Sequence, residues 1–169
     1  MARTRRTRST FAVALASLAL AACETTPAPR AAPAAAAVPP APPVHLERIS
    51  ADGLFPFSQA TINASGEGRA ALDAVVAKLA RDSRGIAGMQ VIGHSDRVGN
   101  EEANVALSTR RAQAVRDYLA RRGIPAGVIH AVGVGSAEPL VQCPGEQGQA
   151  LIRCLTPNRR VEILINYED

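Results

Sequence analysis

The chain has 169 residues, enough for one folded domain and additional segments. It holds 19 Lys and Arg against 15 Asp and Glu, but four of those 19 stand among the first eight residues. Without them, 15 basic and 15 acidic residues remain, so the rest of the chain is close to neutral. Nucleic-acid binding requires a clustered basic face, so we expect no nucleic-acid partner.

Residues 1–22 have the pattern of a signal peptide, with a basic start and an apolar stretch from Phe11 to Leu20. That stretch is shorter than the roughly 20 apolar residues of a permanent membrane span. The order Leu20-Ala21-Ala22-Cys23 resembles the lipobox, in which the cysteine is acylated and becomes the new N-terminus. The alternative is a plain signal peptide followed by a chance cysteine.

A Pro- and Ala-rich linker, residues 24–44, follows Cys23. Seven of its 21 residues are Pro, which lacks a backbone donor and has a fixed φ, so neither a helix nor a strand ladder forms. An extended segment of this kind reaches roughly 65 Å. We expect residues 23–44 to be a lipidated tether, although an unselected tail is the alternative. Glu24 follows the cysteine, and by resemblance to lipoprotein sorting in proteobacteria a residue other than Asp at that position favours the outer membrane.

The folded domain is expected at residues 45–169, and it begins with a strand region between Leu46 and Phe57. The apolar members of this region are Ile49, Leu54, Phe55 and Phe57. Pro56 marks an edge or the end of the strand because it cannot donate to a ladder. A helix from Ser65 to Arg81 follows, with Ser65 as its N-cap and Gly85 as its stop. Its apolar face is Leu72, Val75, Val76 and Leu79.

The remaining elements complete a β-α-β-α-β-β order. Strands are expected at 89–93, 128–134 and 160–165, and a second helix at 101–122. The apolar face of that helix is Val105, Ala112, Val115 and Leu119, flanked by Leu107. This order predicts an α/β (α+β) two-layer sandwich, with helices on one face of a mixed four-stranded sheet.

Cys143 and Cys154 flank a Gly-rich loop before the last strand. If Cys23 carries lipid, they form an even pair in an oxidising compartment, which predicts a disulfide. Closing so short a loop is worth roughly 3 kcal/mol in the chain-entropy model. A zinc site is the alternative, but two cysteines without a nearby His or third Cys make a poor one. We therefore expect neither a metal nor a cofactor.

The segment from Gly93 to Gly99 carries Asp96 out of a strand end into a turn. Asn104 and Arg111 lie seven residues apart on the following helix, hence on one side of it. A carboxylate, an amide and a guanidinium can therefore converge beside the strand end. Such a site suits a ligand with an ammonium for Asp96 and a carboxylate for the fork of Arg111.

Three motifs in this chain, G-H-S-D-x-x-G, N-x-x-L-S-x-x-R-A and N-R-R-V-E-I, resemble the OmpA C-terminal-like domain over about residues 46–167. Outer-membrane porin-type proteins, peptidoglycan-associated lipoproteins and flagellar stator proteins share this domain. The resemblance implies that Asp96 and Arg111 bind the diaminopimelate of peptidoglycan stem peptides and that Asn104 lines the pocket.

The same resemblance implies roles for an end-strand motif and for a rim. In the end-strand motif, Asn158 is joined by Arg159 or Arg160, and strand alternation lets only one of the two arginines face the ligand. The rim motif F-x-F-D of the family reads Phe55-Pro56-Phe57-Ser58 here, so Ser58 replaces an Asp. If a carboxylate matters at that position, affinity falls; if its backbone N–H is what donates, little is lost. Residues 143–160 resemble the porin-type members that carry a disulfide.

His94 and Ser95 suggest a hydrolase, with His94 as base and Ser95 as nucleophile. Consecutive strand residues point to opposite faces, however, and the chain has no G-x-S-x-G elbow. We therefore expect a non-enzymatic protein, with His94 packed and hydrogen-bonded.

The function expected from these observations is a wall-binding tether: a lipid-anchored outer-membrane protein whose periplasmic domain binds peptidoglycan. The alternative is a component of a Tol-Pal-like or secretion envelope complex that uses the same domain as an assembly partner. A stator role is disfavoured, since such stator proteins carry a true transmembrane helix and the apolar stretch from Phe11 to Leu20 is too short to be one. A periplasmic wall hydrolase is the third hypothesis.

Overall fold

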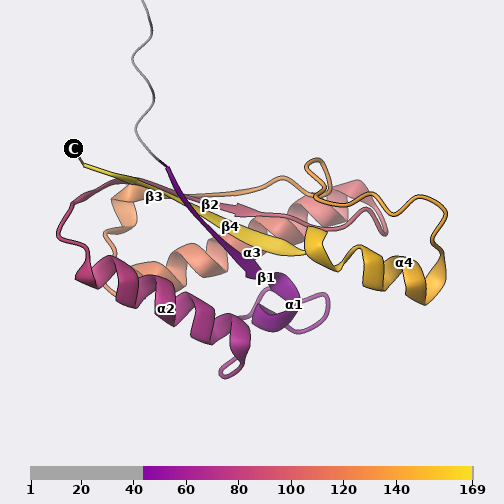
Figure 1. Cartoon of the computed structure of the whole chain (residues 1–169), viewed down its shortest axis with the longest axis horizontal. Coiled ribbons are helices and arrows are strands. Elements are labelled where there is room, and N and C mark those ends of the chain that lie inside the picture. The colour runs from indigo at the N-terminus through magenta and orange to yellow at the C-terminus, as the bar shows by residue number, and fades with distance from the viewer. Residues whose placement is uncertain (1–43, 169) are drawn as a thin grey trace, which may run out of the picture. The chain divides into compact units, whose positions relative to one another are not determined.

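The computed structural model describes residues 44–168, so the expected signal peptide, Cys23 and nearly all of the linker lie outside the described residues. Figure 1 shows the elements in space. In chain order they are β1 (His45–Ser50), α1 (Ala51–Leu54), α2 (Glu67–Arg81), β2 (Ile86–Gly93), α3 (Glu101–Arg121), η1 (Ala126–Val128), β3 (Ile129–Gly133), α4 (Gly148–Cys154), η2 (Thr156–Asn158) and β4 (Arg160–Tyr167). Among these described elements, no helix has the length and apolarity to span a membrane.

The four strands form one sheet in the order β1-β4-β2-β3. β2 and β3 are parallel, whereas β4 is antiparallel to both β1 and β2. The mixed four-stranded sheet with helices packed on it is thus confirmed. Along the central strand β4, Val161, Ile163 and Ile165 are fully buried, while the residues between them are partly exposed. This alternation places one face of the sheet against the core.

The core lies between that face and helices α2 and α3. α2 contributes Leu72, Val75 and Leu79, and α3 contributes Ala112, Val115 and Leu119, as expected. Val105 is exposed instead, whereas Arg111 and Ser108 in the same half of the helix are buried. The half of α3 nearest the end of β2 therefore buries polar side chains rather than apolar ones.

Two glycines let α3 lie close against the sheet. A Cβ on Gly93 would lie 2.1 Å from the carbonyl oxygen of Ser108, and one on Gly133 would lie 2.1 Å from the backbone nitrogen of Thr109. Any side chain at either position would push the helix away. The close approach fixes α3 beside the strand end from which the Asp96 turn leaves.

The first strand is shorter than the expected strand region between Leu46 and Phe57. β1 ends at Ser50, and residues 51–54 form the short helix α1. Leu54 and Phe55 are both buried, which neighbouring residues of a half-buried strand cannot be, since successive side chains point to opposite faces. Phe57, expected in the same strand, is 97% exposed.

Other element ends also differ from expectation. Gly66, with φ of 123°, is the N-cap of α2 in place of Ser65, and α2 ends at Arg81 with Asp82 as its C-cap, ahead of Gly85. α3 ends at Arg121, β2 begins at Ile86 and β4 continues to Tyr167. The Gly-rich loop between the cysteines contains helix α4. Tertiary packing sets these ends, and local sequence signals place them less well.

Candidate functional site

A pocket of about 370 Å³ opens where β2, α1, α3, α4 and the start of β4 meet. We call it the Asp96 pocket. Its lining residues are Asp52, Phe55, Phe57, Ser58, Ser95, Asp96, Val98, Asn104, Leu107, Arg111, Ile152 and Arg159. Six of the eight residues expected to bind the ligand therefore come together here. Asn158 and Arg160 do not line it.

Asp96 is held in place from both sides of its carboxylate. One oxygen accepts the backbone N–H of Val98 at 3.0 Å, and the other accepts Nη1 of Arg159 at 2.8 Å. Its side chain is 13% exposed. Asn104 donates to the backbone oxygens of Asp96 and Val98 at 3.1 and 3.2 Å. Asn104 thus fixes the turn that presents Asp96, while also lining the pocket.

Arg111 is buried, with 5% of its surface exposed. Its Nε donates to the backbone oxygen of Gln59 at 2.9 Å, and its guanidinium carbon lies 5.1 Å from the ring centroid of Phe55. Burial lowers the pKa of Arg111, but a guanidinium still keeps its charge near neutral pH. Among the described residues no carboxylate forms an ion pair with it. Its terminal nitrogens remain donors for a ligand.

Arg159 faces the pocket and bridges two carboxylates. It donates to Asp52 at 2.7 Å and to Asp96 at 2.8 Å, and also to Thr156 Oγ1 at 2.9 Å. The hydrogen bonds to Asp52 and then to Asp96 raise the pKa of Arg159, so its charge is permanent. Strand alternation left open which of Arg159 and Arg160 faces the ligand. The structure places Arg159 in the pocket.

Arg160 and Asn158 serve other parts of the fold. Arg160 donates to Glu162 Oε1 at 2.8 Å and to the backbone oxygen of Glu138 at 3.2 Å. Asn158 is 1% exposed, accepts the N–H groups of Leu140 and Val141, and donates to the oxygen of Val141 at 2.7 Å. Both side chains therefore hold the segment before α4 in place.

Sequence reasoning missed several lining residues of the pocket. Asp52 belongs to α1, which was not expected, and Ile152 comes from α4. No local pattern marks these two positions, whereas Phe55 stands in the rim motif Phe55-Pro56-Phe57-Ser58 but was not among the residues expected to bind the ligand. Leu107, by contrast, sits between Asn104 and Arg111 on the same side of α3, so helical spacing could have found it.

The rim of the pocket is apolar. Phe57 is 97% exposed, and Val98 and Ile152 are about half exposed. Ser58, beside Phe57, has φ of 60°, a left-handed conformation that Asn and Asp adopt more readily than Ser. The pocket thus combines two carboxylates and two guanidinia inside with apolar side chains at its edge. That arrangement suits a zwitterionic ligand with an aliphatic part.

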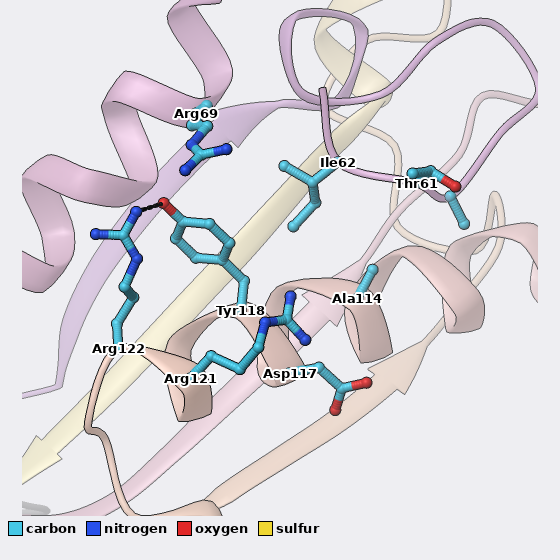
Figure 2. A pocket seen from close by; sticks show the side chains of 9 residues that line it. Thr61, Ile62, Arg69, Ala114, Asp117, Tyr118, Arg121 and Arg122 are labelled. Atoms are coloured by element: carbon cyan, nitrogen blue, oxygen red, sulfur yellow. Dashed lines mark hydrogen bonds between the residues drawn. The ribbon is translucent and has the colours of Figure 1, made fainter. Parts of the chain in front are cut away.

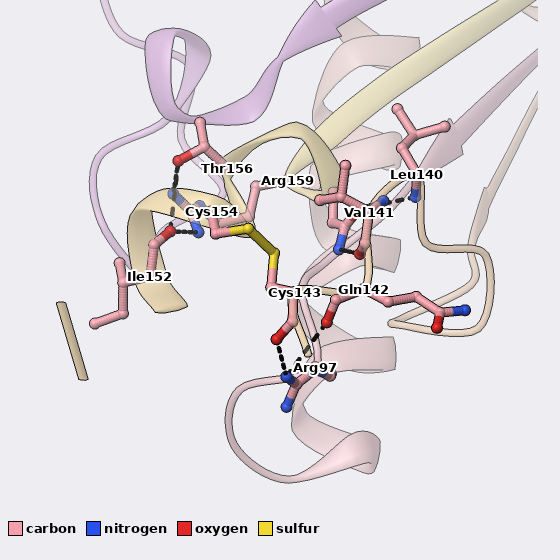
Figure 3. The surroundings of a disulfide bond; sticks show 10 residues. Arg97, Leu140, Val141, Gln142, Cys143, Ile152, Cys154, Thr156 and Arg159 are labelled. Carbon is pink, nitrogen blue, oxygen red and sulfur yellow. Dashed lines mark hydrogen bonds between the residues drawn. A yellow bond between two sulfur atoms is a disulfide. The ribbon is translucent and has the colours of Figure 1, made fainter. Parts of the chain in front are cut away.

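The expected disulfide between Cys143 and Cys154 is formed, and Figure 3 shows its surroundings. It ties α4, which carries Ile152, to the segment before it. Arg97, next to Asp96, donates to the backbone oxygens of Gln142 and Cys143 at 3.4 Å. The bond therefore stabilises one wall of the Asp96 pocket.

His94 and Ser95 diverge, as strand alternation requires. Ser95 lines the pocket, whereas His94 is 1% exposed and lies on the side of Arg160 and Glu162. Burial, and then the charge of Arg160, lower the pKa of His94, so it is neutral at pH 7. The expected hydrogen bonds of His94 are absent among the described residues: Nε2 comes no closer than 3.8 Å to Glu162. His94 and Ser95 therefore do not form a nucleophile–base pair with each other.

The sequence of this chain is similar to those of known proteins. The model of the OmpA family matches residues 54–153. Outer membrane protein A of Yersinia pseudotuberculosis is 45% identical over 129 residues, and that of Shigella flexneri is 43% identical over 129 residues. Each match covers 73% of this chain and 36% of the relative, so the chain spans about a third of the length of these relatives.

Solved structures share the fold. The cell wall anchor of the T6SS from Pseudomonas aeruginosa superposes with a TM-score of 0.59 at 27% identity, covering 74% of this chain and 82% of that one. The peptidoglycan-associated lipoprotein from Burkholderia pseudomallei gives 0.54 at 22% identity, covering 70% and 89%. At 22% identity the second likeness concerns the fold alone.

Proposed function

The chain belongs to the OmpA family, and we propose that it binds peptidoglycan non-covalently through diaminopimelate and tethers the outer membrane to the cell wall. The observation that carries this proposal is the Asp96 pocket. There, a buried arginine without a carboxylate partner among the described residues lies in the same pocket as the carboxylates of Asp52 and Asp96. The site is a binding site, in keeping with the non-enzymatic character of the family.

The chemistry of diaminopimelate matches this arrangement. Its free end carries an ammonium and a carboxylate on one carbon, attached to an aliphatic chain. The ammonium would donate to Asp96 and Asp52, sharing them with Arg159, and the carboxylate would accept the terminal nitrogens of Arg111. Charge-assisted hydrogen bonds of this kind are about twice as strong as neutral ones. The aliphatic chain would lie against the apolar rim.

The anchor is the second part of the proposal. We infer that Cys23 is acylated, that residues 24–44 span the distance to the wall, and that the domain faces the periplasm. Two or more acyl chains on one residue hold a protein stably in a bilayer. The support is the order Leu20-Ala21-Ala22-Cys23 and the seven prolines that follow it. Labelling with a palmitate analogue, with Cys23→Ser as the control, tests this part.

The test of wall binding is sedimentation of the purified full-length chain with peptidoglycan sacculi. Asp96→Ala and Arg111→Ala each remove one of the ligand's two charged partners. Losing one partner of a desolvated charge pair costs roughly 2–5 kcal/mol, so both variants are expected to bind tens-fold more weakly.

Arg110→Ala is the matched control, because Arg110 is exposed on the same helix and does not line the pocket. It removes the same charge and should bind like the wild type. Circular dichroism establishes that each variant is folded. Wild-type protein that stays in solution, or pocket variants that sediment as well as Arg110→Ala, would refute the proposal.

A second function, assembly into an envelope complex, is favoured by the likeness to the T6SS cell wall anchor at 27% identity. In that case the domain would bind the wall or a partner protein as part of a larger apparatus. Failure of the wild type to bind sacculi would place this function first.

A further inference from the structure

A second hollow, of about 560 Å³, lies between α2 and α3. We call it the Arg121 groove; Figure 2 shows the side chains around it. Its lining residues are Ala60, Thr61, Ile62, Arg69, Ala114, Asp117, Tyr118, Arg121 and Arg122. Three of the nine are arginines, and nothing in the Asp96 pocket uses them.

Tyr118 organises two of these arginines. The guanidinium carbons of Arg122 and Arg69 lie 5.0 and 5.5 Å from the centroid of its ring. Its hydroxyl accepts Nη2 of Arg122 at 2.8 Å and donates to Asp73. Burial, and then the bond to Asp73, raise the pKa of Tyr118, so the phenol keeps its proton. The two cations are thus fixed before any ligand arrives.

The carboxylates near the groove already have partners. Asp73 is engaged by Tyr118, by Arg122 at 3.0 Å and by Arg69 at 3.8 Å, and Asp117 by Arg116 at 2.7 Å. Arg121 has no ion-pair partner within residues 44–168 and extends into the groove from α3 in Figure 2. Positive charge is therefore in excess, which favours an anionic ligand.

One side of the groove is apolar. Ala60, Ile62 and Ala114 contribute apolar side chains to its lining. A bare inorganic anion would leave these side chains without a partner. A carboxylate attached to an aliphatic or peptide group would use both the arginines and the apolar side.

The groove and the Asp96 pocket share two structural elements. Residues 57 and 58 line the pocket, and residues 60–62 line the groove. On α3, Arg111 belongs to the pocket and Arg121 to the groove. Ten residues of helix separate them by roughly 15 Å, which an extended peptide covers with about five residues. A single wall fragment is long enough to reach both.

We propose that the Arg121 groove binds a second peptide carboxylate of the same peptidoglycan fragment whose diaminopimelate occupies the Asp96 pocket. This inference rests on the proposed function and adds a second contact to it. Two linked contacts bind more tightly than either does alone, because the second one forms within the complex. The groove would then select polymeric wall over free diaminopimelate.

The test compares two probes by calorimetry with the full-length chain: free meso-diaminopimelate, and cross-linked dimeric muropeptides. The variant Arg69→Gln with Arg121→Gln removes two charges from the groove and leaves Tyr118 and Arg122 in place. It should bind free diaminopimelate like the wild type and the muropeptide at least about tenfold more weakly. Arg81→Gln with Arg110→Gln is the control, with equal charge loss at exposed positions outside both hollows.

The outcomes separate the two proposals. Equal muropeptide affinity in the wild type and the groove variant overturns the groove's role. Failure of the wild type to bind free diaminopimelate overturns the pocket assignment and, with it, the inference of two linked contacts. An anionic phospholipid vesicle is the third probe. If the groove variant loses affinity for the vesicles and keeps it for the muropeptide, the groove binds lipid phosphate and the inference is wrong.

Discussion

Arg159 and Arg160 are neighbours at the start of β4, yet their side chains have different partners. The carbonyl of Arg159 accepts the N–H of Ala51, and that of Arg160 accepts the N–H of His94. The side chain of Arg159 enters the Asp96 pocket and pairs with Asp52 and Asp96. That of Arg160 is 7% exposed and pairs with Glu162, which is 12% exposed.

The two clusters contain the same chemical groups and differ in what remains available. Around Arg160, the donors are used by Glu162 and by backbone oxygens, and Arg160 lines neither the Asp96 pocket nor the Arg121 groove. Around Arg159, a hollow of about 370 Å³ remains, and Arg111, whose Nε alone is bonded to Gln59, is part of its lining. An arginine–carboxylate pair is therefore a ligand site only where space and donors are left over.

The largest effect, a loss of folding stability, is expected from Arg160→Met. It leaves Glu162 largely buried with only the more exposed Arg48 as a partner, and breaking a buried pair costs about 3–5 kcal/mol. Urea denaturation should show this loss, and the double variant Arg160→Met with Glu162→Gln should recover part of it. The folded fraction should still bind sacculi. Intact stability together with lost binding would assign Arg160 to the ligand instead.

The disulfide beside the pocket comes next. Replacing Cys143 and Cys154 together by Ser should lower the free energy of unfolding by roughly 3 kcal/mol, according to the chain-entropy model. It should also weaken sacculus binding, because α4 carries Ile152 and the backbone oxygen that Arg159 contacts at 3.1 Å. Reduction of the wild type by dithiothreitol should reproduce both changes. Unchanged binding after reduction would show that the pocket wall is stable without the bond.

Arg159→Ala should weaken ligand binding and leave stability nearly unchanged, the opposite of what is expected for Arg160→Met. The pair of Arg159 with Asp52, which is 44% exposed, contributes only about 0–1 kcal/mol to folding, and Asp96, which is 13% exposed, keeps the N–H of Val98 when Arg159 is lost. Binding of diaminopimelate should weaken about tenfold, a difference of roughly 1.4 kcal/mol, because Asp96 loses the group that orients it. Calorimetry with free diaminopimelate and thermal unfolding measure the two quantities. A large stability loss without a change in affinity would contradict the comparison.

The smallest expected effect is on the pH dependence of stability, and it comes from His94, which lies beside Arg160 and Glu162. Burial lowers the pKa of His94 below its ordinary 6.5, so the unfolded chain takes up this proton first. The contribution of the neutral His94 ring to the free energy of unfolding is therefore fully present above about pH 7, and it is lost as the pH falls below 6.5. His94→Gln should flatten the pH dependence of unfolding in that range. An unchanged pH profile in this variant would assign the dependence to another group.

Local patterns in the sequence were sufficient for much of the architecture. Periodicity located α2, α3 and the core positions of β4, because a helix or strand buried on one side repeats its apolar residues at a fixed spacing. Motif spacing also brought Asp96, Asn104 and Arg111 together, since all three lie within one strand–turn–helix unit whose geometry is nearly constant. The paired cysteines likewise indicated their own bond.

Contacts between distant segments were decided only by the tertiary structure. Asp52, Ile152 and Arg159 meet at the pocket across about a hundred residues of chain, through α1 and α4, whose formation no local pattern predicted. Alternation in β4 showed that one arginine had to face each side, but not which one, because that choice depends on how the sheet sits against α1 and α3. The Arg121 groove exists for the same reason: two helices, each with an ordinary charged surface, become a site only when they pack side by side.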